Sequence, residues 1–337
     1  MNYNMKEWFK GLYGTGEKKP MPVLSFPCVS ILGISVRELI SDSDLQAKGM
    51  KAIADRTDAA ASVSFMDLSV EAECFGANVV ISDDEVPTIK GRIVHDMDEA
   101  EALEVPAVGS GRTQIYIDAI KKASEFITDR PVLAGMIGPY SLAARLLDVS
   151  EIMMDCYDDP DMVHLVLDKV TTFLCEYAAA YKAAGANGIV MAEPVSGLLS
   201  PDLEEEFSSP YVKRIVDAVQ DDSFGVIYHN CGDNVPVMLD SILSVGAAAY
   251  HFGNSVDLEN DIIAAVPSDV LVMGNVDPAG VLRLGNPESV REATLELLEK
   301  CSKYDNFVLS SGCDIPPMTP FENIDAFFAA SKEFYGK

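Results

Sequence analysis

The chain has few basic residues for its length. Its 337 residues include 53 aspartates and glutamates but only 25 lysines and arginines, which gives a formal net charge of −28. Such a surface repels phosphate backbones and anionic lipid headgroups, and no cluster of basic residues offsets it. We therefore expect neither a nucleic acid nor a membrane as a partner. The acidity favours solubility, or alternatively a docking face for a basic protein.

Export signals and long apolar runs are also missing. Residues 1–16 lack the apolar core and the small-residue cleavage site of a secretory signal. No apolar run approaches the roughly 20 residues that are needed to cross a bilayer. We therefore expect a cytoplasmic protein, in which the seven cysteines do not form disulfides. Each cysteine is then a core residue, a metal ligand or a nucleophile.

Short apolar, β-branched runs recur along the chain and alternate with helical patterns. Eight runs are predicted to be strands: 22–26, 62–66, 131–136, 188–192, 225–229, 248–252, 270–274 and 306–310. Two intervening helices should begin at Asp159-Pro160 and Asn286-Pro287, where a capping side chain precedes a proline. Strands that alternate with helices predict a parallel sheet covered by helices. Eight of them favour a (β/α)8 TIM barrel over an open sheet.

Two segments depart from this alternation. Residues 1–20 are predicted to form a helical extension outside the barrel. Residues 71–106, after the second strand, are predicted to be an insertion with a hairpin near the barrel mouth. The length suits one large barrel, because such domains run from about 200 to more than 400 residues. We therefore interpret residues 1–337 as a single domain.

Metal-ligating residues follow two of the predicted strands. His229 and Cys231 lie at the end of the fifth strand, and Cys313 lies just beyond the eighth. The carboxyl ends of barrel strands open onto one face, so these residues should be neighbours in space. Two thiolates and one imidazole suit a tetrahedral Zn²⁺ whose fourth position stays open, as in catalytic sites. A thiol in that position would lose its proton and remain nucleophilic, which favours alkyl transfer to sulfur. The alternative is that His-x-Cys is ordinary strand alternation and that the cysteines are core residues.

These residues and several longer segments resemble a known family. The segments are 65–77 (FMDLSVEAECFGA), 138–143 (GPYSLA), 193–201 (EPVSGLLSP), 274–278 (GNVDP) and 317–320 (PMTP). Together with His229, Cys231 and Cys313, they are similar to the methylcobalamin:coenzyme M methyltransferases of the uroporphyrinogen decarboxylase superfamily. The resemblance extends from about residue 20 to residue 335, and it implies a (β/α)8 barrel.

The resemblance implies methyl transfer between a methyl-corrinoid and a zinc-bound thiolate such as coenzyme M. The corrinoid would be carried by a partner protein, because none of the four histidines belongs to an Asp-x-His-x-x-Gly motif. Other acceptors, or the demethylation of a methyl donor to charge the corrinoid protein, remain open. The direction of transfer, the fourth ligand and the oligomeric state also remain open.

Further site residues are assigned within this interpretation. Glu193 is a candidate fourth zinc ligand or base, although a strand-end acid without a role is an equal alternative. His251 and Asp277 are candidate catalytic residues at strand ends, and a satisfied strand-end histidine is the alternative for His251. Asn275 is a candidate for polar contacts with the cofactor or substrate, and Tyr140 is a candidate for the corrinoid side. In addition, Asp233 and Asp314 follow ligands and are candidates for orienting them.

Two other functions are compatible with the fold. The decarboxylases of the superfamily bind a polycarboxylate through an arginine-rich segment after the first strand. Here residues 26–33 read FPCVSILG and contain no arginine, so the charge pattern disfavours this substrate. A non-catalytic binding barrel would keep the fold and lose the open metal position.

Overall fold

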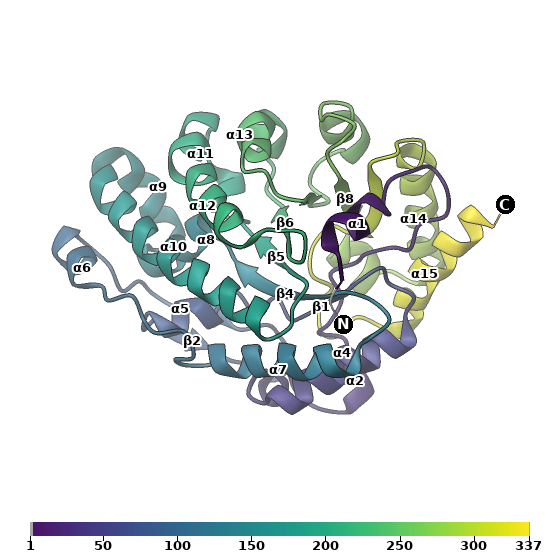
Figure 1. The fold of residues 1–337 in the computed structure, drawn as a ribbon, viewed down its shortest axis with the longest axis horizontal. Coiled ribbons are helices and arrows are strands. Elements are labelled where there is room, and N and C mark those ends of the chain that lie inside the picture. Colours follow the sequence, from purple (N-terminus) through teal and green to yellow (C-terminus); the bar gives the residue numbers. More distant parts are fainter. Residues whose placement is uncertain (1–2, 337) are drawn as a thin grey trace.

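Parallel strands form the centre of the molecule. The computed structural model describes residues 3–336, and seven of its strands form one curled sheet (Figure 1). In sheet order these are β1 (Ser62–Val63), β4 (Val132–Ile137), β5 (Gly188–Ala192), β6 (Gly225–Asn230), β7 (Ala249–Phe252), β8 (Val272–Val276) and β9 (Phe307–Ser311). All pairings in this sheet are parallel. Each strand falls within or next to a predicted run, and the predicted barrel-like α/β fold class is confirmed.

Both faces of the sheet are buried, which explains why the strands read as continuous apolar runs rather than alternating ones. Every residue of β4, β5, β6 and β7 is buried. The side chains on the inner face form one cluster inside the barrel, which includes Val63, Leu133, Val190, Ile227, Ala249, Met273 and Val308. The side chains on the outer face join a larger cluster beneath the helices.

Helices surround the outside of the sheet (Figure 1). They are α2 (Cys28–Leu32), α3 (Val36–Ile40), α4 (Ser43–Arg56), α5 (Val70–Cys74), α6 (Met97–Ala102), α7 (Thr113–Phe126), α8 (Pro139–Leu147), α9 (Val149–Asp158), α10 (Pro160–Ala183), α11 (Pro201–Phe207), α12 (Ser209–Val219), α13 (Leu239–Ser244), α14 (Pro287–Cys301) and α15 (Phe321–Tyr335). The two predicted helix starts are confirmed, since the Asp159 and Asn286 side chains accept hydrogen bonds from the first turns of α10 and α14. Short helical turns are η1 (Ser196–Leu198), η2 (Val235–Met238), η3 (Leu258–Ile263) and η4 (Pro278–Arg283).

The segment predicted as the first strand, 22–26, does not form one. It nevertheless lies between β9 and β1, because Val23 N donates to the Ser311 hydroxyl at 3.1 Å and the Ser25 hydroxyl donates to Ser64 O at 3.2 Å. Just before it, Met21 N donates to Leu309 O and Ala60 N donates to Pro20 O, both at 2.8 Å. Alternate residues of an extended chain point their N–H groups to opposite sides, so Pro20 and Pro22 lack the donors that would face β1. The two prolines therefore prevent a regular ladder where a barrel's eighth strand would lie.

The N-terminal extension contains α1 (Met5–Lys10), whose apolar side covers the amino-terminal end of the barrel. Met5 and Phe9 belong to the interior cluster. The ring of Phe9 occupies the space that a β-carbon on Gly225 would need. Tyr13 then donates a hydrogen bond to Asp269 O at 2.6 Å, just before β8. This end of the barrel is thus closed by the chain itself.

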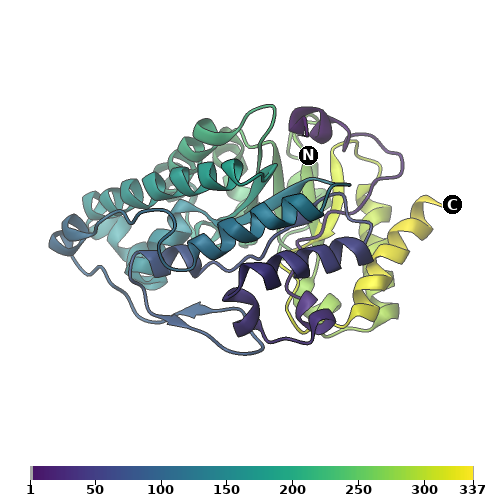
Figure 2. The same cartoon turned by 60° about the horizontal axis from the view of Figure 1, so that its bottom comes forward.

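The insertion after β1 contains a small antiparallel hairpin, β2 (Val79–Val80) and β3 (Thr88–Ile89), as predicted. It lies at the periphery of the molecule, at the lower edge of the view in Figure 2. Ile93 N and Val94 N, which follow the hairpin, both donate to Leu146 O at the end of α8. The insertion is thereby tied to α8, on the side where β1 ends.

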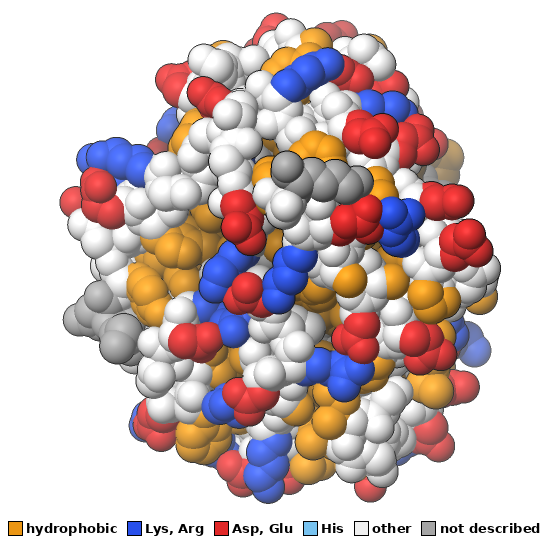
Figure 3. All heavy atoms as spheres, turned by 90° about the vertical axis from the view of Figure 1, so that its right-hand side faces the viewer, with side chains coloured by type: hydrophobic (Ala, Val, Ile, Leu, Met, Phe, Trp, Pro, Cys, Tyr) orange, Lys and Arg blue, Asp and Glu red, His pale blue; other side chains and the backbone are white. Residues whose placement is uncertain are grey.

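Surface charges are mixed. On the face shown in Figure 3, acidic and basic side chains are interspersed with hydrophobic ones. Exposed pairs such as Arg291–Glu333 and Lys213–Asp217 are typical of the surface, and each contributes little to stability because water screens it. Of the helices described, none has the length and apolar character that crossing a membrane requires.

Candidate metal centre

Three sulfur and nitrogen ligands converge at the carboxyl end of the sheet. His229 lies in β6, Cys231 directly follows this strand, and Cys313 lies two residues beyond the end of β9. One ligand atom from each residue lies within 4.8 Å of the other two. The Nε2 atom of His229 is 3.4 Å from the Cys313 sulfur. The structure therefore brings together the three residues that were predicted to be metal ligands.

Close backbone packing holds the two cysteines. A β-carbon on Gly253 would lie 2.5 Å from the Cys231 Cα, and one on Gly232 would lie 2.4 Å from the Gly197 Cα. Gly312, which precedes Cys313, packs against Asn254 in the same way, with only 2.8 Å to its backbone nitrogen. Only glycine fits such approaches. The cysteine loops are thus pressed against neighbouring loops, which limits their movement.

The two thiols differ in their electrostatics. The Cys231 thiol donates toward Cys313, which lowers the pKa of Cys313 well below its usual value although burial opposes the shift. The same hydrogen bond, together with burial, raises the pKa of Cys231. One sulfur of the pair is therefore disposed to carry a negative charge even before a cation is present. A cation would stabilise both thiolates.

The donor set fits zinc. A tetrahedral zinc ion with bonds of about 2.0–2.3 Å needs ligand atoms roughly 3.5 Å apart, which is compatible with the 3.4 Å separation of His229 and Cys313. Thiolates and imidazole are the ligands that zinc prefers, whereas calcium and magnesium prefer oxygen. With three ligands from the protein, one tetrahedral position would remain for a substrate atom.

A chain of hydrogen bonds fixes the orientation of His229. The Ser310 hydroxyl donates to Met21 O at 2.7 Å, so it accepts from Nε2–H of His251, which is also 2.7 Å away. The other nitrogen of His251 is then the acceptor for Nδ1–H of His229 at 2.7 Å. The Nε2 atom of His229 consequently carries a free lone pair directed toward Cys313. Burial, followed by the nearby His229, holds the pKa of His251 well below its usual value, which keeps this ring neutral.

Sequence reasoning did not identify Ser310 or the Met21 carbonyl in this chain. Ser310 follows the inward-facing Val308 by two residues, so strand alternation could have placed its hydroxyl inside the barrel. The carbonyl of Met21 belongs to the irregular segment beside β9, and no residue pattern indicates its position. His251, expected near the substrate, lies buried beside His229 with 1% of its surface exposed.

Glu193 lies next to His229 in the backbone but points elsewhere. Its N–H donates to His229 O at 2.8 Å. The preceding residue, Ala192, faces the barrel interior, so the Glu193 side chain faces the helices. There its carboxylate accepts hydrogen bonds from Tyr140 N and from the backbone and hydroxyl of Ser141, at 2.7–2.9 Å. Burial raises the pKa of Glu193 to about 7, although the bonds from Ser141 and Tyr140 oppose the shift.

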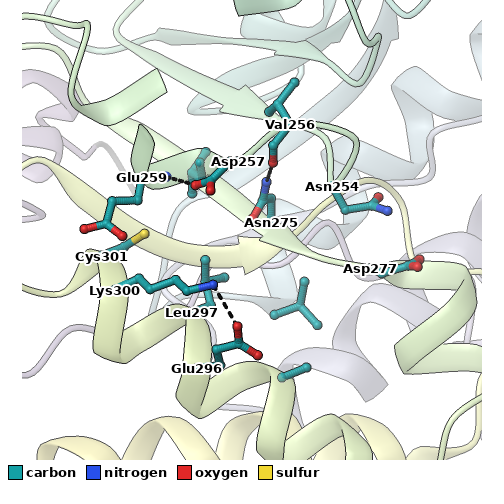
Figure 4. Close-up of a pocket in the computed structure, with 13 residues that line it drawn as sticks. Asn254, Val256, Asp257, Glu259, Asn275, Asp277, Glu296, Leu297, Lys300 and Cys301 are labelled. Atoms are coloured by element: carbon teal, nitrogen blue, oxygen red, sulfur yellow. Dashed lines mark hydrogen bonds and ion pairs between the residues drawn. The ribbon is translucent and has the colours of Figure 1, made fainter. Parts of the chain in front are cut away.

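Asn275 and Asp277 line a pocket of about 410 Å³ between η3, the end of β8 and α14 (Figure 4). The Asn275 amide donates to Gly253 O at 2.8 Å and to Val256 O at 3.0 Å. The carboxylate of Asp277 caps η4 by accepting from Ala279 N and Gly280 N. Asn275 thus supports the loop of Gly253, which packs against Cys231, whereas Asp277 caps η4 and lines the pocket.

The remaining predicted residues occupy different surroundings. Tyr140 is fully buried, and its hydroxyl lies 3.7 Å from the Cys156 sulfur. Asp233 is exposed at the surface. The carboxyl of Asp314 is buried, one of its oxygens lacks a hydrogen-bond partner, and burial raises its pKa well above the usual value.

A barrel that carries an open cysteine–histidine centre at the carboxyl ends of its strands has the architecture of an enzyme. A model of the uroporphyrinogen decarboxylase (URO-D) family matches residues 25–334, and the chain belongs to this family. The relationship that the sequence motifs indicated is thereby confirmed.

The names of the individual relatives describe two different activities. The methylcobamide:CoM methyltransferase MtbA of Methanosarcina acetivorans is 30% identical over 274 residues, which are 80% of this chain and 78% of that protein. A uroporphyrinogen decarboxylase of Coxiella burnetii is 28% identical over 295 residues, which are 81% of this chain and 77% of that protein. Among solved structures, a methyltransferase from Methanosarcina mazei superposes with a TM-score of 0.85 at 26% identity and covers 98% of both chains.

Proposed function

We propose that the chain is a zinc-dependent methyltransferase. It would transfer a methyl group between a methyl-corrinoid, held by a separate corrinoid protein, and the sulfur of a small thiol such as coenzyme M. The observation that carries this proposal is the convergence of His229, Cys231 and Cys313 within 4.8 Å. The similarity to a methylcobamide:CoM methyltransferase over 80% of the chain supports it.

His229, Cys231 and Cys313 would hold the zinc ion in this proposal. When bound, zinc lowers the pKa of a coordinated thiol and keeps it as a thiolate at neutral pH. The chain's own contribution is orientation, since His251 and Ser310 fix the protonated nitrogen of His229. The acceptor sulfur forms a bond to the methyl carbon while the cobalt–carbon bond breaks. The two electrons of the cobalt–carbon bond remain on the corrinoid, and the thiol proton goes to solvent.

The principal alternative is decarboxylation of a porphyrinogen. Its support is the similarity to uroporphyrinogen decarboxylases at slightly lower identity. Against it stands the segment 26–33, which forms α2 after the irregular first segment and carries no arginine. A polycarboxylate substrate would therefore lack cationic partners at this position. The converging thiols would also have no role in that reaction.

The proposal is tested with the purified chain, methylcobalamin and a panel of thiols. We expect one zinc ion per chain and zinc-dependent methylation of at least one thiol. Cys313→Ala should lose the zinc and the activity while its thermal unfolding stays near that of the wild type. Cys175→Ala, which changes a cysteine on α10 outside the site, is the matched control and should keep both. Full zinc occupancy and turnover in Cys313→Ala would contradict the ligand set.

Uroporphyrinogen is assayed in parallel. Its decarboxylation, with no methyl transfer to any thiol, would favour the alternative function. An inactive protein that binds zinc would indicate a binding barrel or a missing partner. Adding methylated corrinoid protein to the assay separates these two results, because only a true transferase then becomes active.

A further inference from the structure

Arg145 is the one arginine in the described part of the chain without a carboxylate partner. The other eight arginines each have a carboxylate oxygen within 4.0 Å, and they are Arg37, Arg56, Arg92, Arg112, Arg130, Arg214, Arg283 and Arg291. Among the described residues, no ion pair or hydrogen bond joins Arg145 to any group, and its Nε atom is buried without a partner. In a chain with 53 acidic residues, this isolation is unexpected.

Burial makes the isolation energetically costly. Arg145 lies in the last turn of α8 and is half-buried. Desolvation lowers its pKa, and no neighbouring charge opposes that shift. A guanidinium nevertheless keeps its proton in proteins, so the side chain remains a partly desolvated cation. Such a cation is stable when an anion pairs with it. Arg112, by contrast, is ion-paired with Asp67 and Glu73.

Arg145 borders a pocket of about 140 Å³ between the hairpin and the end of β1. Its other walls are Met66, Leu68, Ser69, Val86, Pro87, Thr88 and Ile89. None of these residues is acidic, so the pocket offers Arg145 no counter-ion. The volume suits one small group such as a sulfonate, a carboxylate or a phosphate. Arginine binds such groups through two parallel N–H···O bonds.

The pocket adjoins the barrel interior. Met66 belongs to the interior cluster, and its sulfur occupies the space that a β-carbon on Gly135 of β4 would need. Leu68 packs against the same cluster. Both residues follow β1, at the carboxyl end of the sheet, where His229 and the two cysteines also lie. An anion bound at Arg145 would thus be held at the same end of the barrel as the candidate metal centre.

We propose that the Arg145 pocket is a binding site for an oxyanion group of a substrate. Within the proposed function, on which this assignment of the substrate rests, the group has two possible sources. One is a sulfonate or carboxylate on the tail of the thiol. The other is the phosphate in the nucleotide loop of the corrinoid. Both present oxygens to a single guanidinium, and kinetic experiments distinguish them.

The site itself is tested without any turnover. Ethanesulfonate, propionate and inorganic phosphate are titrated into the protein by calorimetry at constant ionic strength. We expect at least one of them to bind, and Arg145→Gln to weaken that binding by ten-fold or more. Arg145→Lys, which keeps the charge but loses the fork of donors, should be intermediate. Arg92→Gln removes an arginine paired with Glu151 beyond the hairpin, and it should bind as the wild type does. No binding by the wild type, or equal binding by Arg145→Gln, overturns the proposal.

The source of the anion is tested by steady-state kinetics. If the thiol supplies it, Arg145→Gln should raise KM about ten-fold for 2-mercaptoethanesulfonate and leave KM for 2-mercaptoethanol unchanged. If the corrinoid supplies it, the KM for methylcobalamin should rise, whereas that for methylcobinamide, which lacks the nucleotide loop, should not. Equal losses for all four substrates contradict a substrate-anion site. Anion binding that depends on Arg145, in a protein that methylates no thiol even when methylated corrinoid protein is added, would uphold the site and reject the proposed function.

Discussion

The Nδ1 atoms of His229 and His251 lie 2.7 Å apart, so one of the two rings must donate a proton and the other must accept it. Two contacts decide between them. The His251 carbonyl oxygen lies 3.2 Å from His229 Nδ1 and can only accept, and the Ser310 hydroxyl, which donates to Met21 O, requires a proton on Nε2 of His251. His229 is therefore the donor, and its Nε2 lone pair faces the two cysteines. His251 is buried and is not itself a proposed ligand. Through its contact with Nδ1 of His229, it helps to leave Nε2 as the nitrogen that can bind a metal.

We expect His251→Phe to weaken zinc binding about 10-fold, because the ring fills the same space but removes the acceptor at 2.7 Å and leaves His229 Nδ1 only the carbonyl of residue 251 at 3.2 Å. The measurement is a competition titration against a chelator of known affinity. Tyr250→Phe is the control, since Tyr250 lies on the same strand but faces outward, where its hydroxyl donates to Leu243 O. A zinc affinity in His251→Phe within two-fold of the wild type would show that the histidine pair does not orient the ligand.

A second prediction concerns the rigidity of the candidate metal centre, and it follows from the close packing of Gly253 against Cys231. A β-carbon added at Gly253 would lie only 2.5 Å from the Cα of Cys231, so Gly253→Ala must displace the Cys231 loop. We expect the variant to fold but to bind zinc at least ten-fold more weakly, since a metal site tolerates only small ligand displacements. Gly16→Ala adds the same methyl group where no atom lies within 4 Å, and it should leave zinc binding unchanged.

Calorimetric titration of zinc into the metal-free forms of both variants measures this difference. Wild-type affinity in Gly253→Ala would mean that the loop carrying Cys231 adapts freely. The close packing around the centre would then have no bearing on metal binding.

Much of the fold follows from local sequence. Seven strands were predictable because each is a continuous apolar run, as burial on both faces of a parallel sheet requires. The eighth run, 22–26, is similarly apolar but forms no regular strand, because Pro20 and Pro22 lack N–H donors toward β1. The proximity of Cys313 to His229 was also predictable, because barrel strands open onto one face.

The details of the site depend on relationships that a single sequence does not reveal. The direction of Glu193 depends on strand phase, since Ala192 takes the inward position beside His229. The contact of His251 with Ser310 depends on how β7 and β9 face each other across the barrel interior. The isolation of Arg145 is a property of its surroundings in space, because carboxylates are abundant along the chain but none in its described part pairs with this side chain. Such distances between side chains cannot be predicted from the composition of the chain or from the spacing of its residues.

A third prediction concerns Glu71, which is fully buried after β1. One of its carboxyl oxygens accepts from Ile137 N at 3.1 Å, whereas the other has no hydrogen-bond partner. Burial raises the pKa of Glu71 to about 8, from an ordinary value of 4.5. Between these two values the folded chain binds a proton that the unfolded chain releases. The free energy of unfolding should therefore fall as the pH rises from about 5 to about 8.

Glu71→Gln replaces the ionisable carboxyl group with a neutral amide. It should therefore flatten the pH dependence of the free energy of unfolding. The amide keeps an oxygen for Ile137 N, so the variant and the wild type should have similar stability at pH 5. At pH 9 the variant should be more stable by a few kcal/mol at most, since one pKa unit corresponds to about 1.4 kcal/mol. Urea unfolding of both proteins at pH 5, 7 and 9 tests this, with the exposed Glu104→Gln as the control for a lost surface charge. Comparing variant with wild type at each pH cancels the titration of all groups that the two share. A constant difference across the three pH values would mean that Glu71 is ionised in the folded protein, and that Arg112 or bound water compensates its charge.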